Sequence, residues 1–267
     1  MVNQSARLTK ILDYVLENGS IQVEDIETLL GVSPATARRD LDRLASQQMV
    51  TRVRGGAVAN PLSGDLPLRY RPVNSGRAKQ RLAKAAAKLV KPGDVIGLNG
   101  GTTTTEVSRE LVARVGADGG FKRQGITVVT NAINIANELA LRPQIKVIVV
   151  GGTMRPCSYE IVGNMSGLVL QNLAMTRVFL GVVGIDMKRG LFNDDLLEAE
   201  TNADFLKSAQ RVTVVADSSK FSALGTARIC DFTPIDEILT DCADSKTLEL
   251  LEGQGIKVLT VKDLQTK

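Results

Sequence analysis

The chain has 267 residues, 43% of them hydrophobic, and carries a formal net charge of +4 with no histidine. The absence of histidine excludes histidine-based catalytic triads and histidine metal sites, and no apolar run approaches the roughly 20 residues that a membrane-spanning helix needs. The N-terminus lacks the apolar core of a secretory signal. Three cysteines without a ligand-like spacing are typical of free thiols in a reducing compartment. We therefore expect a cytoplasmic protein with no metal, no cofactor and no membrane partner.

Two short helices joined by a tight turn are predicted in the first fifty residues. Apolar side chains at helical spacing predict the first helix over residues 22–30, and Gly31 permits the left-handed conformation that ends it. Ser33 is a good N-cap, and Pro34 suits the first position of a second helix, over residues 34–47. The polar and cationic N-terminal end of this second helix is typical of a recognition helix that enters the DNA major groove.

Flanking segments extend this pair into a winged helix-turn-helix. Residues 8–18 predict a supporting amphipathic helix, and residues 50–58 predict a β-hairpin with two β-prone runs either side of a glycine pair. The alternative interpretation is a solvated helix whose arginines pair with Asp42 or with the neighbours of Arg43. The expected DNA contacts are Ser33, Ala35, Thr36, Arg38, Arg39 and Arg43 of the recognition helix, with Arg52 and Arg54 of the hairpin gripping the backbone.

A second, larger unit of α/β class follows. We expect a winged helix-turn-helix over 1–59, a proline- and glycine-punctuated linker over 60–76 and an α/β domain over 77–267. The last begins with a helix over 78–90. Continuous apolar strands then alternate with helices, which indicates a mainly parallel sheet covered on both faces. The expected strands are 95–98, 126–130, 146–150, 178–183, 212–216, 237–240 and 257–261, and the intervening helices lie near 104–114, 133–141, 166–173, 197–209 and 245–253.

Glycines and polar side chains collect where the predicted strands end, and in open α/β sheets the ligand crevice lies outside the carboxyl ends of the strands. Residues 99–105, rich in glycine and threonine, open a helix whose free amides and dipole favour an anion. They match neither a Walker A loop nor GxGxxG, so no nucleotide site is indicated. The alternative is an ordinary helix cap.

Side chains of both charges follow the later strands. Asp186 and Glu198 can accept sugar hydroxyls, and Arg155 and Lys220 can hold an anion. Any one of these endings is also consistent with a plain turn, but together they predict a small, polyhydroxylated, anionic ligand. The candidate ligand-binding residues are Asn99, Gly100, Gly101, Thr102, Thr103, Thr104, Thr130, Asn131, Gly151, Gly152, Arg155, Asp186, Glu198 and Lys220.

Two sets of motifs carry a family resemblance over essentially the whole chain. The first set is residues 32–41 with the hairpin segment 54–57, and the second follows the strands at 100–104, 130–131, 151–152, 184–186, 198–199 and 217–221. Both resemble the DeoR family of bacterial transcription regulators. The chain departs from that family at Asn99, where the family often has Asp, and at Arg54, where the family commonly has His. Arginine in place of histidine still supplies a hydrogen-bond donor and adds a permanent charge, so we expect the phosphate contact to persist.

The resemblance implies a sensor domain similar in fold to ribose-5-phosphate isomerase, which binds a phosphorylated sugar or a related metabolite. It also implies a regulator, usually a repressor, of a sugar-catabolism operon, released from double-stranded operator DNA by that effector. We expect no enzyme activity, a homodimer or homotetramer, and association with the nucleoid when DNA is bound. Two alternatives are a sugar-phosphate isomerase-like enzyme with a DNA-binding module, and a nucleoid-type DNA binder without an effector.

Overall fold

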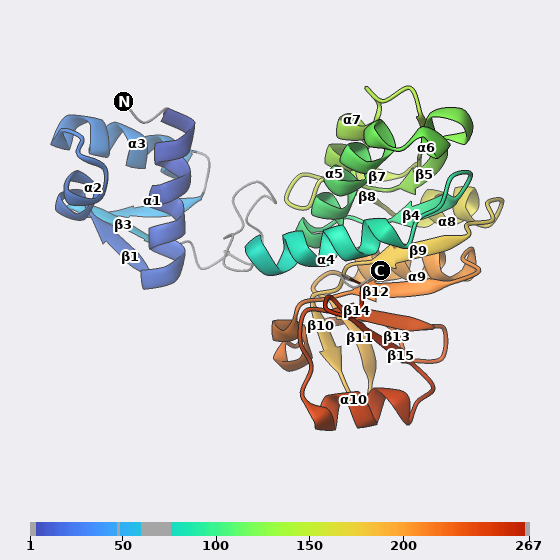
Figure 1. Ribbon diagram of the computed structural model, residues 1–267. Coiled ribbons are helices and arrows are strands. Elements are labelled where there is room, and N and C mark those ends of the chain that lie inside the picture. Colours follow the sequence, from blue (N-terminus) through green and yellow to red (C-terminus); the bar gives the residue numbers. More distant parts are fainter. Residues whose placement is uncertain (1–3, 47–48, 60–75, 265–267) are drawn as a thin grey trace. The chain divides into compact units, whose positions relative to one another are not determined.

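Two compact units make up the chain in the computed structural model (Figure 1), and each is described by itself. The units are Met1–Asn74 and Ser75–Lys267, and the structure describes residues 4–46, 49–59 and 76–264. The expected linker over 60–76 lies outside the described residues except for Gly76, which begins a helix. Among the described residues, no helix combines the length and the apolar character needed to cross a membrane.

Within its described residues, the N-terminal unit has three helices and a small antiparallel sheet. These are α1 (Gln4–Asn18), β1 (Ser20–Gln22), α2 (Val23–Leu30), α3 (Pro34–Ser46), β2 (Val50–Val53) and β3 (Gly56–Ala59). The strand order is β1-β3-β2. The helices and the β2–β3 hairpin confirm the predicted winged helix-turn-helix, whereas the three-residue strand β1 was not predicted.

The hairpin turn lies one residue earlier than its glycine pair suggested. Arg54 and Gly55 form the turn, and Gly56 already pairs with Val53 in the ladder. Gly56 also pairs with Gln22 of β1, and a Cβ built on it would lie 2.1 Å from the carbonyl oxygen of Ile21. Only glycine lets these two strands approach so closely, which ties the wing to the helices.

The C-terminal unit is built on a seven-stranded sheet in which every pairing is parallel. The prediction of a mainly parallel α/β domain is therefore confirmed, and each of the seven expected strands lies in this sheet. In sheet order the strands are β15 (Lys257–Thr260), β14 (Glu237–Thr240), β12 (Val212–Val215), β9 (Arg177–Leu180), β4 (Val95–Leu98), β5 (Ile126–Thr130) and β6 (Ile145–Val149).

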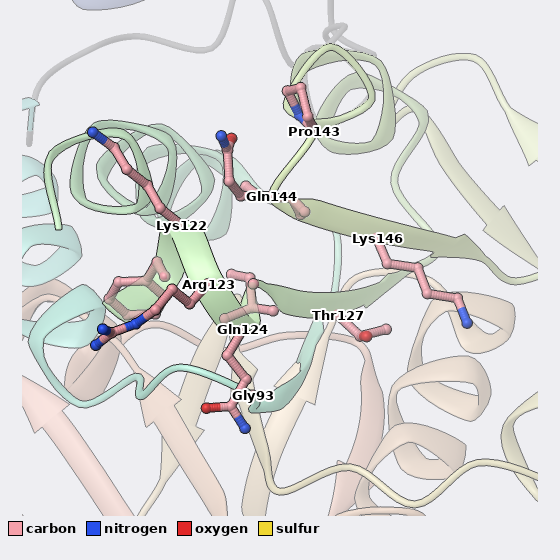
Figure 2. Close-up of a pocket in the computed structure, with 12 residues that line it drawn as sticks. Gly93, Lys122, Arg123, Gln124, Thr127, Pro143, Gln144 and Lys146 are labelled. Carbon is pink, nitrogen blue, oxygen red and sulfur yellow. The ribbon is translucent and has the colours of Figure 1, made fainter. Parts of the chain in front are cut away.

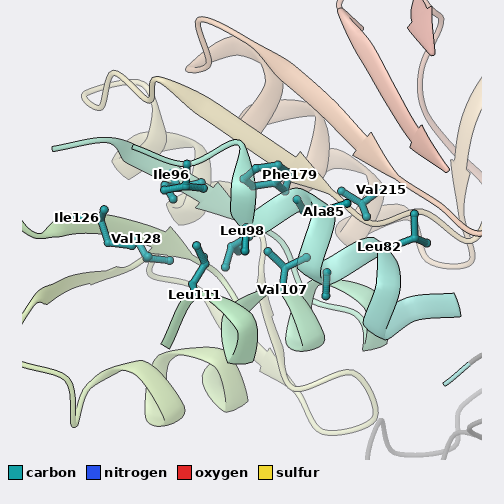
Figure 3. Packing of buried hydrophobic residues seen from close by; sticks show 14 of the residues in the cluster. Leu82, Ala85, Ile96, Leu98, Val107, Leu111, Ile126, Val128, Phe179 and Val215 are labelled. Atoms are coloured by element: carbon teal, nitrogen blue, oxygen red, sulfur yellow. The ribbon is translucent and has the colours of Figure 1, made fainter. Parts of the chain in front are cut away.

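Alternate residues of each strand face two separate hydrophobic clusters, so the sheet is buried on both sides. One cluster (Figure 3) joins Ile96, Leu98 and Phe179 of the strands to helices on one face, and the other joins Val178 and Leu180 to helices on the opposite face. The first group of helices is α4 (Gly76–Lys88), α5 (Thr102–Ala117), α6 (Gly119–Gln124) and α7 (Ile133–Leu139). The second is α8 (Asn164–Leu170), α9 (Leu196–Lys207) and α10 (Ser245–Glu252).

Smaller elements decorate the carboxyl ends of the strands and were not predicted. A hairpin follows β6, and a three-stranded antiparallel sheet follows β9, which ends at Leu180 rather than at Val183. The hairpin consists of β7 (Thr153–Arg155) and β8 (Glu160–Val162), and the small sheet of β10 (Gly184–Asp186), β11 (Gly190–Asn193) and β13 (Ala227–Cys230). A 3-10 helix, η3 (Ser218–Ser222), follows β12.

Candidate functional site

The turn between α2 and α3 has the geometry that its sequence predicts. Gly31 adopts a left-handed conformation with φ of 64°, and its N–H donates to the carbonyl oxygen of Glu27 at 2.9 Å. The N–H of Thr36 donates to the carbonyl oxygen of Ser33 at 2.9 Å, and the hydroxyls of these two residues lie 3.0 Å apart. Both polar side chains therefore stand at the N-terminal end of α3, with Pro34 as its first residue.

The exposed face of α3 presents free cations. Arg38 and Arg39 are exposed, and neither forms an ion pair or hydrogen bond with any residue in the described part of the chain. The alternative in which they pair with Asp42 is not what the structure shows, because Asp42 accepts from Arg52 at 2.9 Å. Arg43 is also exposed and donates to Gln4 of α1 at 3.1 Å. This face can offer guanidinium groups to DNA without first breaking ion pairs.

The two wing arginines have different environments. Arg52 is half-buried and donates to Asp42 and to the carbonyl oxygen of Gly56 at 2.5 Å, so it ties the wing to α3. Arg54 is exposed at the hairpin turn. The N–H of Val23 donates to the carbonyl oxygen of Gly55 at 2.9 Å and anchors that turn to the start of α2. Of the two, Arg54 is therefore the one placed to reach a phosphate.

A buried ion pair orients the recognition helix and was missed from the sequence. Asp40 of α3 is 1% exposed, and its carboxylate accepts from Arg7 Nε at 2.9 Å and Arg7 Nη2 at 3.2 Å. The guanidinium fork matches the two carboxylate oxygens, which fixes α3 against α1. The signal in the sequence was an acidic residue in phase with the buried Ala37, Leu41 and Leu44.

At the carboxyl end of β4, the first turn of α5 forms a cradle of backbone N–H groups. Gly101 precedes the helix with φ of 142°, and its carbonyl oxygen accepts from the hydroxyls of Thr104, at 3.2 Å, and Thr105, at 2.7 Å. Those hydroxyl protons are thus not available to an anionic ligand. The backbone N–H groups of Thr102, Thr103 and Thr104 have no partner among the described residues, and they lie at the positive end of a 16-residue helix.

Asn99 and Asn131 hold the loops around this cradle. The amide of Asn99 is 1% exposed; it donates to the carbonyl oxygen of Gly181 at 2.9 Å and accepts from the N–H of Gly181 at 2.8 Å. Asn131 is fully buried and accepts from the N–H of Gly100 at 3.2 Å. The hydroxyl of the buried Thr130 accepts from a backbone N–H at 3.1 Å. Three of the predicted ligand residues are therefore engaged in positioning the strand ends.

The structure brings Arg155 and Glu198 together. Arg155 of β7 donates to Glu198 at 3.1 Å and to Asp195 at 2.6 Å, so two carboxylates balance its charge. Glu198, which is 7% exposed, also accepts from Asn193 at 3.2 Å. Asp195 caps the N-terminus of α9. This network joins the β7–β8 hairpin to α9 beside the carboxyl edge of the sheet.

The glycines after β6 serve the hairpin fold. The carbonyl oxygen of Gly151 accepts from the hydroxyl of Ser166 at 2.8 Å. Gly152 has φ of 147°, and a Cβ built on it would lie 2.5 Å from the carbonyl oxygen of Val162. A side chain at this position would therefore clash with β8, which explains why the sequence has glycine there.

The position expected for Asp186 was wrong. This residue does not follow a strand of the large sheet but ends β10 of the small antiparallel sheet. Its carboxylate accepts from the N–H of Lys188 at 2.9 Å and from the side chain of Arg189 at 2.9 Å, and these hydrogen bonds hold its pKa below the ordinary value. The glycine before it resembled a strand ending because β10 begins only a few residues after β9.

Lys220 lies in η3, at the carboxyl end of β12. Its side chain is half-buried and makes no hydrogen bond or ion pair with the residues the structure describes. Asp217, 3% exposed, caps the same 3-10 helix by accepting from the N–H of Ser219 at 3.1 Å, and its second oxygen has no partner among the described residues. Because β9 pairs with both β12 and β4, one strand separates Lys220 and Asp217 from the α5 cradle.

A cavity of about 510 Å³ (Figure 2) lies at the opposite edge of the sheet, where β5 and β6 begin. Lys122, Arg123 and Lys146 line it, and none of the predicted ligand residues does. Lys122 and Arg123 are in the last turn of α6, where cations balance the negative end of the helix. The positive charges of Lys122 and Arg123 therefore have a structural explanation. Across the described ranges there is no cluster of three or more cysteine and carboxylate side chains suited to hold a metal ion.

Comparison with known proteins matches both units to family models. The model described as "DeoR-like helix-turn-helix domain" matches residues 7–61, and "DeoR C terminal sensor domain" matches residues 74–242. The proposed aga operon transcriptional repressor of Escherichia coli O157:H7 is 34% identical over 263 residues, which cover 96% of this chain and 94% of that protein. The glycerol-3-phosphate regulon repressor of Escherichia coli K12 is 27% identical, over 90% of this chain and 92% of that protein.

Among solved structures, ribose 5-phosphate isomerase A of Methanocaldococcus jannaschii aligns with a TM-score of 0.42 at 19% identity, over 55% of each chain. The helix-turn-helix geometry, the parallel-sheet domain and the two family matches agree in their order along the chain. The chain belongs to the DeoR family and is a DNA-binding transcription regulator.

Proposed function

We propose that this regulator represses a sugar-catabolism operon and leaves its operator when a phosphorylated sugar binds the C-terminal unit. The observation that carries the proposal is the pairing of two features in one chain. One is a recognition helix whose Arg38 and Arg39 are exposed and unpaired among the described residues. The other is a set of free helix amides at the carboxyl edge of a parallel sheet. The named relatives, an aga operon repressor and a glycerol-3-phosphate regulon repressor, support the same class of function.

On DNA, α3 reads bases in the major groove. Thr36, Arg38 and Arg39 stand on its exposed N-terminal part and supply the base contacts, while Ser33 and Ala35 lie beside them against the backbone. Arg54 at the wing turn and Arg43, whose partner Gln4 is neutral, contact phosphates. Arg52 supports these contacts by holding the wing to α3 through Asp42.

Arg39→Ala tests the base contacts. A bidentate arginine–guanine pair contributes about 1–3 kcal/mol of discrimination, so we expect operator affinity to fall roughly ten- to hundredfold while binding to scrambled DNA changes little. Fluorescence anisotropy with both DNAs measures this. Arg142→Ala, which removes one exposed cation from the C-terminal unit, is the matched control. Equal losses on both DNAs would show that Arg39 contacts only phosphate.

For the effector, the free amides of Thr102, Thr103 and Thr104 bind the phosphate, and Gly100 and Gly101 let it approach the backbone. Lys220, unpaired among the described residues, reaches the same edge from η3 and adds a positive charge. Two groups of residues around this phosphate site form the wall that contacts the sugar. One is the Arg155–Glu198 pair, and the other is the set of loops held by Asn99, Thr130, Asn131, Gly151 and Gly152. Asp186 is left out of this wall because Arg189 and its own turn occupy its oxygens.

Lys220→Ala tests the effector site. Because Lys220 lies in the C-terminal unit, we expect the variant to bind operator normally but to need at least about tenfold more sugar phosphate for release. Lys246→Ala, which removes an exposed lysine from α10, is the control. A normal dose response in Lys220→Ala would remove this residue from the proposed site.

We also propose that the protein does not catalyse sugar-phosphate isomerisation, the alternative activity for this fold. Both oxygens of Glu198 accept hydrogen bonds, from Arg155 and Asn193, so this carboxylate is not poised as a general base. A direct assay of pentose and hexose phosphate isomerisation tests the point, and turnover above background would contradict it.

The assembly that follows from this function is a homodimer or homotetramer acting in the cytoplasm, because symmetric operators are read by symmetric oligomers. Light scattering coupled to size-exclusion chromatography, on the full chain with and without operator, measures the state. A monomer on operator DNA would contradict the proposed assembly.

A further inference from the structure

One face of α4 carries only positive charge. Its exposed charged side chains recur at helical spacing and form a basic stripe of four residues, Arg77, Arg81, Lys84 and Lys88. The opposite face of the helix belongs to the hydrophobic cluster of Figure 3, in which Leu82 and Ala85 are buried. The basic stripe is therefore open to solvent along almost the whole length of the helix.

The basic stripe has no nearby counter-charge in the sequence or in the fold. Residues 66–93 contain eight lysines and arginines and no aspartate or glutamate. The side chains of Arg77, Arg81 and Lys84 form no ion pair or hydrogen bond with the described residues. Lys88 donates to a neutral acceptor, the carbonyl oxygen of Leu264, at 2.6 Å. Because like charges three and four residues apart on a helix repel one another, the stripe by itself lowers the stability of α4.

The helix dipole does not explain these charges. Cations stabilise the last turn of a helix, where the free carbonyl groups lie, and are unfavourable in the first turn. Arg77 is in the first turn of α4, and Arg81 is near its middle. At the other end, the guanidinium of Arg114 from α5 already donates to the carbonyl oxygens of Ala87 and Val90. The basic stripe therefore has no role in capping its own helix.

A surface with this pattern of charge is complementary to the backbone of duplex DNA. An α-helix rises 1.5 Å per residue, so the basic stripe extends about 16 Å, and the duplex carries one negative charge for about every 1.7 Å of its axis. Lysine and arginine side chains on such a backbone release counterions and gain affinity without reading sequence.

The same chain already brings DNA within reach of α4. It binds DNA through its helix-turn-helix unit, and residues 60–75 connect that unit to α4. A segment of that length spans at most roughly 55 Å. A duplex bound by the first unit is therefore present at a high effective concentration for the basic stripe.

We propose that the basic stripe of α4 is a second DNA-contacting surface, which binds phosphates of the duplex beside the sequence that α3 reads. It contributes affinity and not sequence discrimination, because phosphates are the same on every sequence. This surface depends on the DNA binding that the chain shares with its family, and it does not depend on the proposed sugar phosphate.

The test removes three charges of the stripe together, by Arg77→Gln, Arg81→Gln and Lys84→Gln, because glutamine is neutral and is a good helix former. Fluorescence anisotropy on the full chain, with its own upstream DNA and with scrambled DNA, measures affinity between about 50 and about 200 mM salt. Near physiological salt we expect affinity to fall about tenfold or more, by the same factor on both DNAs. The slope of log affinity against log salt should become shallower by about two to three, roughly one for each lost phosphate contact.

The matched control removes two arginines and one lysine from other exposed positions of the same unit, by Arg123→Gln, Arg142→Gln and Lys246→Gln. Both triple variants should melt within a few degrees of the wild type. An equal loss of affinity in the control would show a general effect of net charge, and an unchanged affinity and salt slope in the α4 variant would show that the stripe is only a solvated face. Either result would overturn the proposal, and so would loss of the oligomer with normal DNA binding, which would assign the stripe to a contact between copies.

Arg39→Ala separates this surface from the proposed base contacts. That variant should lose affinity for the operator alone, whereas the α4 variant should lose affinity for both DNAs. If the wild type does not prefer its own upstream DNA, the proposed reading of sequence by α3 fails, while the salt series on scrambled DNA still tests the basic stripe.

Discussion

The buried amide of Asn99 joins the loop after β4 to the loop after β9, and replacing it by aspartate should weaken this edge of the sheet. The amide donates to the carbonyl oxygen of Gly181 at 2.9 Å and accepts from its N–H at 2.8 Å, with 1% of the residue exposed. Asn99→Asp keeps the acceptor and loses the donor, so a carboxylate oxygen faces a carbonyl oxygen. An unsatisfied buried acceptor costs about 1–3 kcal/mol, and we take about 2 kcal/mol as the expected loss.

For a unit of this size, a change of about 2 kcal/mol corresponds to a fall in Tm of roughly 4–8 °C. Thermal unfolding followed by circular dichroism at pH 7 measures it, with Asn137→Asp, an exposed site on α7, as the control. Protonation of the introduced carboxyl restores a donor toward Gly181, so the gap between variant and wild type should narrow as the pH falls toward about 5. A variant that melts with the wild type at pH 7 would refute the assignment of Asn99 as a structural clamp.

Two further predictions concern titratable groups. Burial alone raises the pKa of Glu237, but hydrogen bonds and charge from Arg177, then Thr213 and Arg211, outweigh it and hold the pKa below the ordinary value. A carboxyl whose pKa is lower in the folded state than in the unfolded state stabilises the fold above the unfolded pKa, and this stabilisation is lost as the pH falls through the folded pKa. Glu237→Gln should therefore make Tm fall less steeply between about pH 5 and about pH 3 than it does in the wild type. An unchanged dependence of Tm on pH would contradict this. Burial, mainly, raises the pKa of Cys230 to about 12, whereas Cys242 is exposed. A disulfide reagent at about pH 8 should therefore modify Cys242 at least about tenfold faster than Cys230, and peptide mass spectrometry measures both rates. Equal rates would contradict the burial of the Cys230 thiol.

The helices, strands and turns that depend on the residues of one short segment could be predicted from the sequence. The strands of the large sheet are rich in apolar residues and are bounded by turn residues, because the interior of a parallel sheet is buried on both faces. The turn before α3 was equally readable, since Gly31, Ser33 and Pro34 act through their own backbone preferences.

Side-chain partners across long sequence distances could not be predicted in the same way. Arg155 was expected to hold an anion, and no pattern in the sequence indicated that it pairs with Asp195 and Glu198, forty residues and more away. The spacing of Asp40 placed it on the buried face of α3, but only the packing of α1 against α3 identifies Arg7 as its partner. Such pairings depend on how elements pack, and hydrophobic periodicity carries no information about them.

Short antiparallel elements escaped prediction for a related reason. The β7–β8 hairpin and the small sheet of β10, β11 and β13 have strands of three or four residues, too short for a periodic pattern to emerge. These elements are nevertheless what takes Asp186 away from the carboxyl edge of the large sheet. The edge of the sheet at which the polar strand endings gather was thus predictable, and the identity of the side chains that face this edge was not.

The central claim is that one chain couples sequence-specific DNA binding to a sugar phosphate. The most direct test measures binding of the purified full chain to its own upstream intergenic DNA and to a scrambled control, near physiological salt, with and without a panel of sugar phosphates. The account predicts preference for the native fragment and release by at least one sugar phosphate but not by the corresponding free sugar. Equal and strongly salt-dependent binding to both DNAs, unaffected by every compound in the panel, would contradict it.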